Sequence, residues 1–134
     1  MSARIPLPRP TALSRPHWDG ARAGELRFQR CRDCGEAVFI PQPVCPGCFG
    51  DGLDWAVSSG RGTVYSYSVV HRPPSPGFAV PYIVVIAELE EGWQMLSNLV
   101  GCEPEGVSVG MPIEVTFEKK TDEITLPCFR PAAG

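Results

Sequence analysis

Four cysteines form two closely spaced pairs near the start of the chain. Two residues separate Cys31 from Cys34, two separate Cys45 from Cys48, and ten lie between the pairs. Each pair places two thiols on one tight turn, so all four can bind a single tetrahedral metal ion. Four thiolates leave no open coordination position, so we expect structural zinc and no catalytic metal. The spacing does not distinguish zinc from iron, and a pair of disulfides is the alternative.

The other side chains with chemical potential are scattered. Cys102 and Cys128 lie far along the chain from the four paired cysteines, and we expect both to behave as small apolar residues. His17 and His71 are the only histidines. Neither belongs to a motif typical of a catalytic triad, a phosphate-binding loop or a zinc protease. The sequence therefore predicts a protein that is not an enzyme by itself.

Three aromatic side chains are candidates for ligand binding or docking. Phe78 and Tyr82 belong to a segment, residues 71–82, that is rich in proline and glycine. Such segments act as lids or docking surfaces, and they also serve as ordinary flexible connections. Trp18 lies on a short predicted helix and is expected to pack that helix against its own domain or against a neighbouring protein.

The paired cysteines are positioned by short elements. A helix is predicted from Pro16 to Ala23, where Ser14 can cap it and Gly24 can end it. Short strands over residues 26–30 and 38–40 flank the first cysteine pair. This alternation of strand and cysteine knuckle is the arrangement of a rubredoxin-like zinc ribbon.

From about residue 54 the apolar residues recur with a period of two, which is typical of strands. Residues 90–92 predict a tight hairpin, with Gly92 at a positive φ. About five antiparallel strands in some 80 residues favour a closed barrel of the OB type, since closure removes exposed edges. A fragment of a β-sandwich is the alternative. The strands are expected at residues 63–70, 82–89, 93–100, 113–118 and 124–129.

The fold class predicted is thus mainly β: an N-terminal helix and zinc ribbon followed by an OB-fold barrel. The expected division is an extended proline-rich arm at 1–15, helix plus ribbon at 16–53, barrel at 54–131 and tail at 132–134. Met1 and the short tail after Pro131 favour a complete subunit.

Composition limits the partners. The chain has 12 Lys and Arg against 15 Asp and Glu, which argues against nucleic acid. Tyr65 and Tyr67 could stack on bases, so single-stranded nucleic-acid binding by an OB barrel is the alternative function. No apolar stretch is long enough to span a membrane, so no membrane partner is expected. The first 16 residues lack the apolar segment of a secretory signal, and six cysteines then indicate a reducing, cytoplasmic location.

The order of these motifs resembles a known family. A helix ending in Gly-Glu-Leu precedes Cys-x-x-Cys-Gly and Cys-Pro-x-Cys; residues 60–66, Pro81-Tyr82, residues 110–112 and residues 129–131 follow. The match covers about residues 16–131. It resembles the zinc-ribbon/OB-fold proteins associated with acyl-coenzyme A, catalogued as domain-of-unknown-function family thirty-five.

The resemblance implies a partner and a ligand. Family members assemble with thiolase-fold enzymes, including acetyltransferases, thiolases and the lipid-transfer-protein aldolases of steroid side-chain breakdown. We therefore expect a non-catalytic accessory subunit that docks on such an enzyme, forms a heterotetramer and supports the binding or transfer of acyl-coenzyme A in lipid metabolism. The resemblance also implies metal ligands at Cys31, Cys34, Cys45 and Cys48.

Two arginines are candidates for contacting coenzyme A. The guanidinium groups of Arg61 and Arg72 could pair with its phosphates. Solvated surface charge is the alternative interpretation. The low number of basic residues favours a binding site that is weak or shared with the partner.

Overall fold

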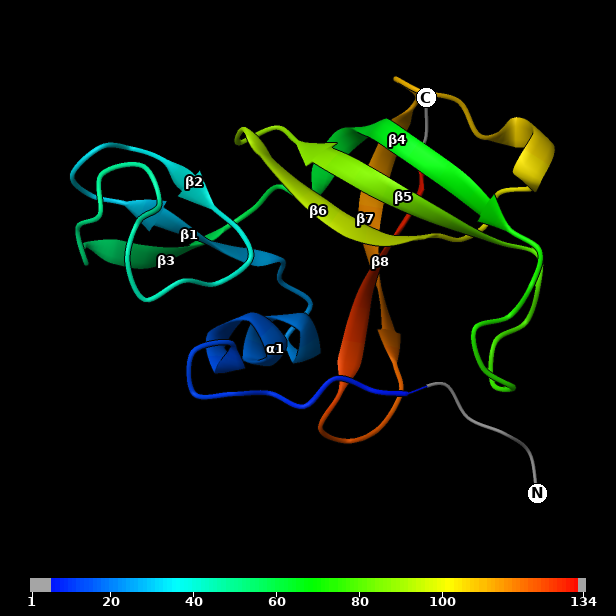
Figure 1. The fold of residues 1–134 in the computed structure, drawn as a ribbon, viewed down its shortest axis with the longest axis horizontal. Coiled ribbons are helices and arrows are strands. Elements are labelled where there is room, and N and C mark those ends of the chain that lie inside the picture. The colour runs from blue at the N-terminus through cyan, green and yellow to red at the C-terminus, as the bar shows by residue number, and fades with distance from the viewer. Residues whose placement is uncertain (1–5, 133–134) are drawn as a thin grey trace.

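A three-stranded sheet and a closed five-stranded barrel follow one another along the chain (Figure 1). The computed structural model describes residues 6–132. Residues 1–5 of the predicted arm and 133–134 of the predicted tail lie outside the described residues. The architecture confirms the predicted fold class, which is mainly β with one N-terminal helix, a ribbon and an OB-like barrel.

The ribbon sheet has the order β2-β1-β3, with both pairings antiparallel. Its strands are β1 (Arg27–Cys31), β2 (Ala37–Val38) and β3 (Leu53–Val57). The strand predicted over residues 38–40 pairs only through Ala37 and Val38. β3 pairs with β1 over its whole length, so the ribbon sheet reaches Val57, past the boundary expected after residue 53.

The barrel has the order β4-β5-β6-β8-β7 and is closed by the pairing of β7 with β4. All its pairings are antiparallel except the contact of β6 with β8, which is parallel at Leu99 and Phe129. A 3-10 turn, η1 (Pro104–Gly106), lies between β6 and β7. The barrel strands are β4 (Arg61–Val70), β5 (Tyr82–Leu89), β6 (Trp93–Leu99), β7 (Pro112–Lys119) and β8 (Thr125–Pro131).

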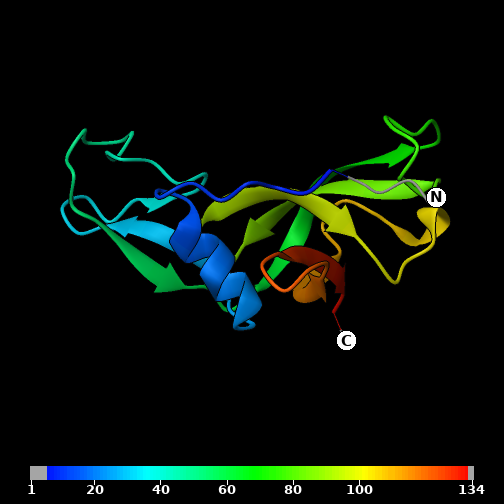
Figure 2. The ribbon, with the colours of Figure 1, turned by 90° about the horizontal axis from the view of Figure 1, so that it is seen from below.

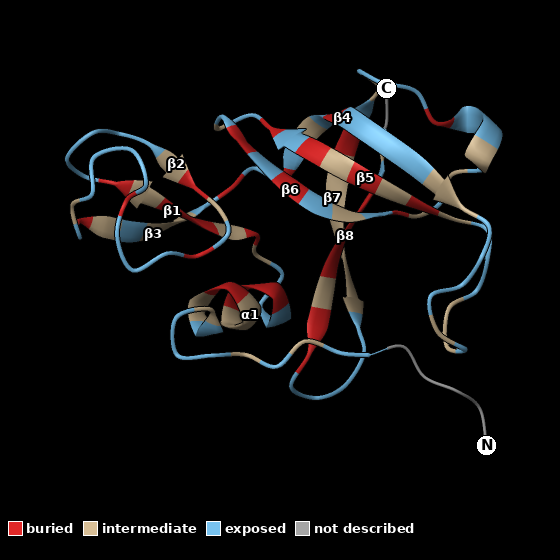
Figure 3. Cartoon of the chain, viewed as in Figure 1, coloured by how far each residue is buried: buried red, intermediate tan, exposed pale blue. Residues whose placement is uncertain are grey.

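The core of the barrel follows from alternation along its central strand. In β5, every second side chain is buried, from Ile83 through Val85 and Ala87 to Leu89 (Figure 3). Strand residues alternate between the two faces of a sheet, so this pattern directs one face into the barrel. Gly92 has a φ of 90° and turns the chain from β5 into β6, as the sequence predicts.

The helix α1 (Arg15–Arg22) packs beside both sheets and contacts β1, β7 and β8 (Figure 2). Pro16 lies in its first turn, where a missing N–H costs nothing. Ser14 occupies the N-cap position, but its hydroxyl accepts a hydrogen bond from the Thr11 backbone N–H at 2.9 Å and caps no helical N–H. Gly24, at a φ of 79°, follows the end of the helix.

A chain of aromatic rings joins the helix, the ribbon and the barrel. The ring centroid of Phe39 lies 5.2 Å from that of His17 and 5.0 Å from that of Trp93. Trp93 also stacks on Phe28 at 5.2 Å. Contacts of this kind bury large apolar surfaces and fix ring orientation. They hold the metal-binding ribbon against one end of the barrel.

Candidate metal centre and ligand surfaces

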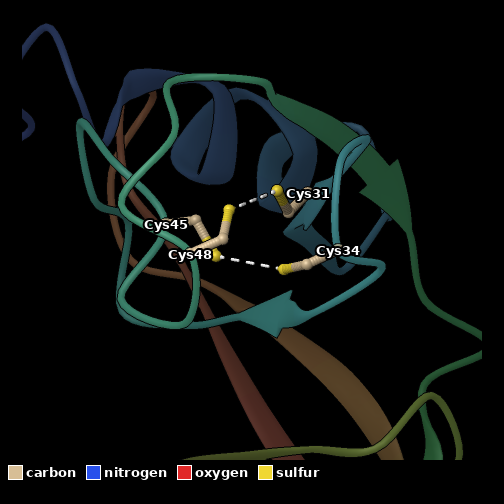
Figure 4. A group of neighbouring side chains, drawn as sticks. All are labelled: Cys31, Cys34, Cys45 and Cys48. Carbon is tan, nitrogen blue, oxygen red and sulfur yellow. Dashed lines mark hydrogen bonds between the residues drawn. The ribbon is translucent and has the colours of Figure 1, made fainter.

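The four paired cysteines converge on one point in the ribbon (Figure 4). The Sγ atoms of Cys31 and Cys48 are 3.6 Å apart, as are those of Cys34 and Cys45. All four sulfurs lie within 4.8 Å of one another. Tetrahedral coordination with Zn–S bonds of about 2.3 Å needs sulfurs separated by about 3.8 Å. The four side chains therefore fit a tetrahedral zinc ion.

The knuckle backbones are shaped for thiolates. The Gly35 N–H donates to the Cys31 carbonyl at 2.9 Å, and the φ of 77° at Gly35 turns the chain away from the first knuckle. In the second knuckle, the Gly47 N–H donates to Cys45 Sγ at 3.3 Å. Cys31 and Cys45 are buried, whereas Cys34 and Cys48 face solvent. Half of the sulfur cluster is therefore screened from water by the ribbon itself.

The four sulfurs are too close together for all of them to be ionised at once without a cation. The backbone N–H groups of Cys34 and Asp33 lower the pKa of Cys31 to about 7, against the effect of burial. The Glu36 backbone N–H favours the Cys34 thiolate, but the neighbouring sulfurs, Cys45 first, together with burial raise the pKa of Cys34 to about 12. One thiol therefore ionises readily and another resists. A bound divalent cation would favour ionisation of the whole set.

The structure separates the basic candidates. Arg61 begins β4 and its Nε lies 3.5 Å from the Glu90 carboxylate, on the exposed surface. Arg72 is exposed in the loop that follows the other end of β4. A ten-residue strand spans about 30 Å, so one bound molecule meets both side chains only if it runs the length of β4.

Trp18 lies apart from the other aromatic candidates. Its ring meets that of His17 edge-on at 4.8 Å, and it lines a polar hollow beside α1. The guanidinium of Arg22 pairs there with Asp19. This hollow combines equal numbers of acidic and basic side chains, so its charge favours neither anions nor cations. Its lining residues are Pro10, Arg15, Trp18, Asp19, Arg22 and Glu123.

Phe78 and Tyr82 are brought together. Their rings stack with centroids 5.5 Å apart and planes inclined by 26°. Both rings line a hollow of about 320 Å³ between the β4–β5 loop and strands β6 and β8. Of the five candidate ligand or docking residues, these two therefore share a site.

An exposed apolar surface was missed by the sequence reasoning. Ile40 and Leu96 are 69% and 68% exposed, although one belongs to the ribbon and the other to the barrel. Both line a shallow hollow of about 510 Å³, together with Phe39, Ile86, Gln94 and Met95. Buried and exposed side chains alternate along β6. Leu96 follows buried Met95 and lies on the exposed, polar side of the strand. An apolar residue at a position where the alternation predicts a polar one is the signal in the sequence that could have revealed this surface.

His17 and Cys128 occupy buried packing positions. His17 is buried, its Nδ1 lies 3.3 Å from the Arg27 carbonyl oxygen, and burial lowers the pKa of its imidazole. His71 is exposed. Burial raises the pKa of Cys128 to about 11, so this thiol stays protonated and unreactive at neutral pH. Among residues 6–132, no helix is long and apolar enough to cross a membrane.

Two family models divide the chain close to the junction of ribbon and barrel. Residues 18–54 match the model described as "ChsH2, rubredoxin-like zinc ribbon domain". Residues 55–118 match "ChsH2, C-terminal OB-fold domain".

Curated relatives carry several descriptions. The 3-oxo-4,17-pregnadiene-20-carboxyl-CoA hydratase alpha subunit of Mycobacterium tuberculosis is 41% identical over 81% of this chain, and the chain spans only 37% of that protein's length. A DUF35 domain-containing scaffold protein of Methanothermobacter thermautotrophicus is 36% identical over 73% of this chain and 75% of its own. The benzoylsuccinyl-CoA thiolase subunit BbsA of Geobacter metallireducens is 32% identical over 57% of this chain and 51% of its own.

A solved structure is similar over nearly the whole chain. It is titled "Ltp2-ChsH2(DUF35) aldolase", and the matched chain is 38% identical with a TM-score of 0.86. The alignment covers 94% of this chain and 99% of that one. The likeness therefore includes the ribbon, the barrel and their arrangement.

Proposed function

The chain belongs to the ChsH2 (DUF35) family of zinc-ribbon and OB-fold proteins, as its motif order predicts, and on this basis we propose that it is a non-catalytic accessory subunit of a thiolase-fold enzyme. The observation that carries the proposal is the likeness to a chain of the Ltp2-ChsH2(DUF35) aldolase, which extends over 99% of that chain. A relative named as a thiolase subunit supports the same partner class.

The proposed subunit docks through apolar surface. Ile40 and Leu96 place two large side chains in water, side by side on ribbon and barrel. Contiguous exposed apolar surface is typical of protein interfaces. Ile40 follows Phe39, whose ring packs against Trp93 of the barrel. The position of Ile40 near Leu96 therefore depends on how the ribbon is placed against the barrel.

Zinc is part of the proposal. Cys31, Cys34, Cys45 and Cys48 would hold one structural ion, which would fix the two knuckles and so the ribbon face of the docking surface. Four free thiols need a reducing compartment to stay unpaired, which favours the cytoplasm.

The proposed ligand is an acyl-coenzyme A handled by the complex. Two relatives are named for coenzyme A thioesters, one of a steroid-like carboxylic acid and one of benzoylsuccinate. We therefore place the chain in the metabolism of lipid or steroid side chains, or of similar bulky acyl groups. Two copies of each subunit would give a heterotetramer, since thiolase-fold enzymes are dimers.

The test is recovery of the partner. A tagged copy would be purified from the native host, and the proteins and nucleic acids retained with it would be identified by mass spectrometry and nuclease digestion. We expect a thiolase-fold protein in near-equal amount. The co-expressed pair should elute as one species whose mass fits two copies of each chain.

A monomer without partners would contradict the proposal. Retained oligonucleotide would instead favour the alternative, in which exposed Tyr65 and Tyr67 on β4 stack on the bases of a single strand. The net charge of −3 weighs against this alternative.

A further inference from the structure

We propose that the hollow beside the stacked rings of Phe78 and Tyr82 binds the apolar, uncharged acyl end of a thioester, and that the coenzyme A moiety lies outside it. The site is formed by the β4–β5 loop, the start of β5, the ends of β6 and β7, and the start of β8. The inference rests on the proposed function for the source of the acyl group. Its physical basis lies in the walls, the rim and the size of the hollow.

The walls are apolar. Phe78 and Tyr82 form one side, with their rings stacked at 5.5 Å. Leu99 and Cys128, each buried, and half-buried Leu126 form the other side. The thiol of Cys128 remains protonated at neutral pH, because its burial opposes ionisation. A ligand inside would therefore meet rings, methyl groups and an uncharged sulfur, which suits an aliphatic or ring-containing acyl body.

The rim carries no net charge. Lys120 Nζ lies 3.3 Å from Glu118 Oε2, and both residues line the hollow. The amide of Asn98 is engaged as well, because its Nδ2 donates to the Ile83 carbonyl at 3.3 Å. A rim that already pairs its cation with a carboxylate does not attract a phosphate. The charges therefore favour the neutral acyl end over the phosphates of coenzyme A.

The size sets a limit on the acyl group. The hollow of about 320 Å³ would hold about ten water molecules, taking about 30 Å³ for each. An acyl chain of about ten carbons, or a ring system of similar volume, would displace that water. Each methylene that enters adds affinity, so binding should strengthen with chain length until the hollow is full.

The experiment compares four ligands on the metal-loaded protein. Coenzyme A, butyryl-CoA, decanoyl-CoA and decanoate would be titrated below their micelle-forming concentrations, with isothermal calorimetry and amide chemical shifts as readouts. We expect decanoyl-CoA to bind roughly tenfold or more tightly than butyryl-CoA, and coenzyme A to leave the hollow unperturbed. Shifts should map to Leu99, Val100 and Leu126.

Variants locate the effect. Phe78→Ala removes one wall and should weaken decanoyl-CoA binding roughly tenfold, with little change for butyryl-CoA. Leu126→Trp fills the hollow and should abolish the preference for the longer chain. Tyr65→Ala, an exposed aromatic on the same barrel outside the hollow, is the matched control and should bind as the unaltered protein does.

The outcomes are distinct. Decanoate binding as tightly as decanoyl-CoA would support the inference, because it would show that the coenzyme A moiety adds nothing to binding and lies outside the hollow. Equal affinity for coenzyme A and decanoyl-CoA, shifts that map elsewhere, or no binding of either decanoyl ligand would overturn the inference. Complex formation is scored separately: Phe78→Ala should still recover the thiolase-fold partner. If the unaltered protein recovers no thiolase-fold partner but keeps its preference for decanoyl-CoA, the accessory-subunit proposal would be contradicted and the acyl pocket would stand.

Discussion

The carboxylate of Glu91 accepts a hydrogen bond from the hydroxyl of Ser58 at 2.6 Å, across the junction between ribbon and barrel. Its other oxygen accepts from the Ser59 backbone N–H at 2.7 Å, and Trp93 Nε1 donates to the carboxylate at 3.1 Å. Ser58 follows the last ribbon strand, and Glu91 lies at the tip of the β5–β6 hairpin. The Glu91 side chain thus connects the segment after β3, the β5–β6 hairpin and the Trp93 ring that packs against the ribbon.

Glu91 makes this junction sensitive to acid. Partial burial opposes its charged form, but the bonds from Ser58, Ser59 and Trp93 outweigh burial, so the pKa of Glu91 lies below its usual value. Its contribution to stability is complete above the ordinary glutamate pKa of about 4.3, and it is lost as the pH falls through the lower folded pKa. We expect Glu91→Gln to lower the free energy of unfolding at pH 7 by about 1–3 kcal/mol.

Urea unfolding as a function of pH measures this effect. The loss caused by Glu91→Gln should shrink at acid pH, where the native carboxylate is itself protonated. Glu90→Gln is the control, because Glu90 pairs with Arg61 on the exposed surface and should cost less than about 1 kcal/mol. An equal loss in both variants would refute a special role for Glu91.

The metal content of the protein should depend on the four clustered cysteines and not on the other two. We expect one zinc ion per chain by elemental analysis, and loss of that ion in Cys45→Ser, because three thiolates bind more weakly than four. Chelation should unfold the ribbon, since structural zinc contributes on the order of 10 kcal/mol to such modules.

Cys102→Ser supplies the matched control for metal content, because Cys102 lies outside the cluster. It should retain the full ion. Iron in place of zinc would correct the identity of the metal, and a metal-free protein with an ordered ribbon would refute a structural role.

Docking should fail when charge enters the exposed apolar surface. Leu96→Asp and Ile40→Asp each place a carboxylate where a partner must exclude water, so either should weaken the complex by roughly tenfold or more. Val109→Asp is the matched control, because Val109 is 67% exposed but lies outside this hollow. Affinity between the purified subunits would be measured by biolayer interferometry, and uniform effects in all three variants would argue for a different interface.

Barrel stability should be sensitive to one glycine. A Cβ added at Gly62 would overlap the carbonyl oxygen of Glu88 on the neighbouring strand β5. Gly62→Ala must therefore separate the two strands, and we expect a loss of about 1–3 kcal/mol or more in thermal unfolding. Gly106→Ala meets only Cys102 Sγ at 3.4 Å and should be close to neutral. Equal melting temperatures for the two variants would contradict this account.

The features that the sequence predicted correctly are those that a few neighbouring residues determine. The cysteine knuckles, the β5–β6 turn at Gly92 and the alternation along β5 each depend on a few neighbouring residues. The proximity of Phe78 to Tyr82 is also local, since four positions separate them. Hence the mainly β character of the chain and the grouping of the four cysteines follow from residue types and their spacing, whereas the choice between a barrel and a β-sandwich does not.

Features that join distant segments could not be derived in this way. Alternation tells which face a residue takes, but it does not tell which strand lies beside it. The sequence therefore does not reveal that β3 pairs with β1 or that Ile40 lies near Leu96. Each of these depends on pairings between strands far apart in the chain.

The parallel contact between Leu99 and Phe129 forms only when β8 joins β6, so the barrel is completed after the ribbon. All strands and cysteines of the ribbon have been synthesised once Val57 leaves the ribosome, so the metal can bind early. The barrel, in contrast, stays open until β8 inserts between β6 and β7. A nascent chain halted at Lys119 would carry a finished ribbon beside two unpaired strand edges, which are templates for aggregation. Insertion of β8 thus covers the edges of β6 and β7 that the earlier strands leave open.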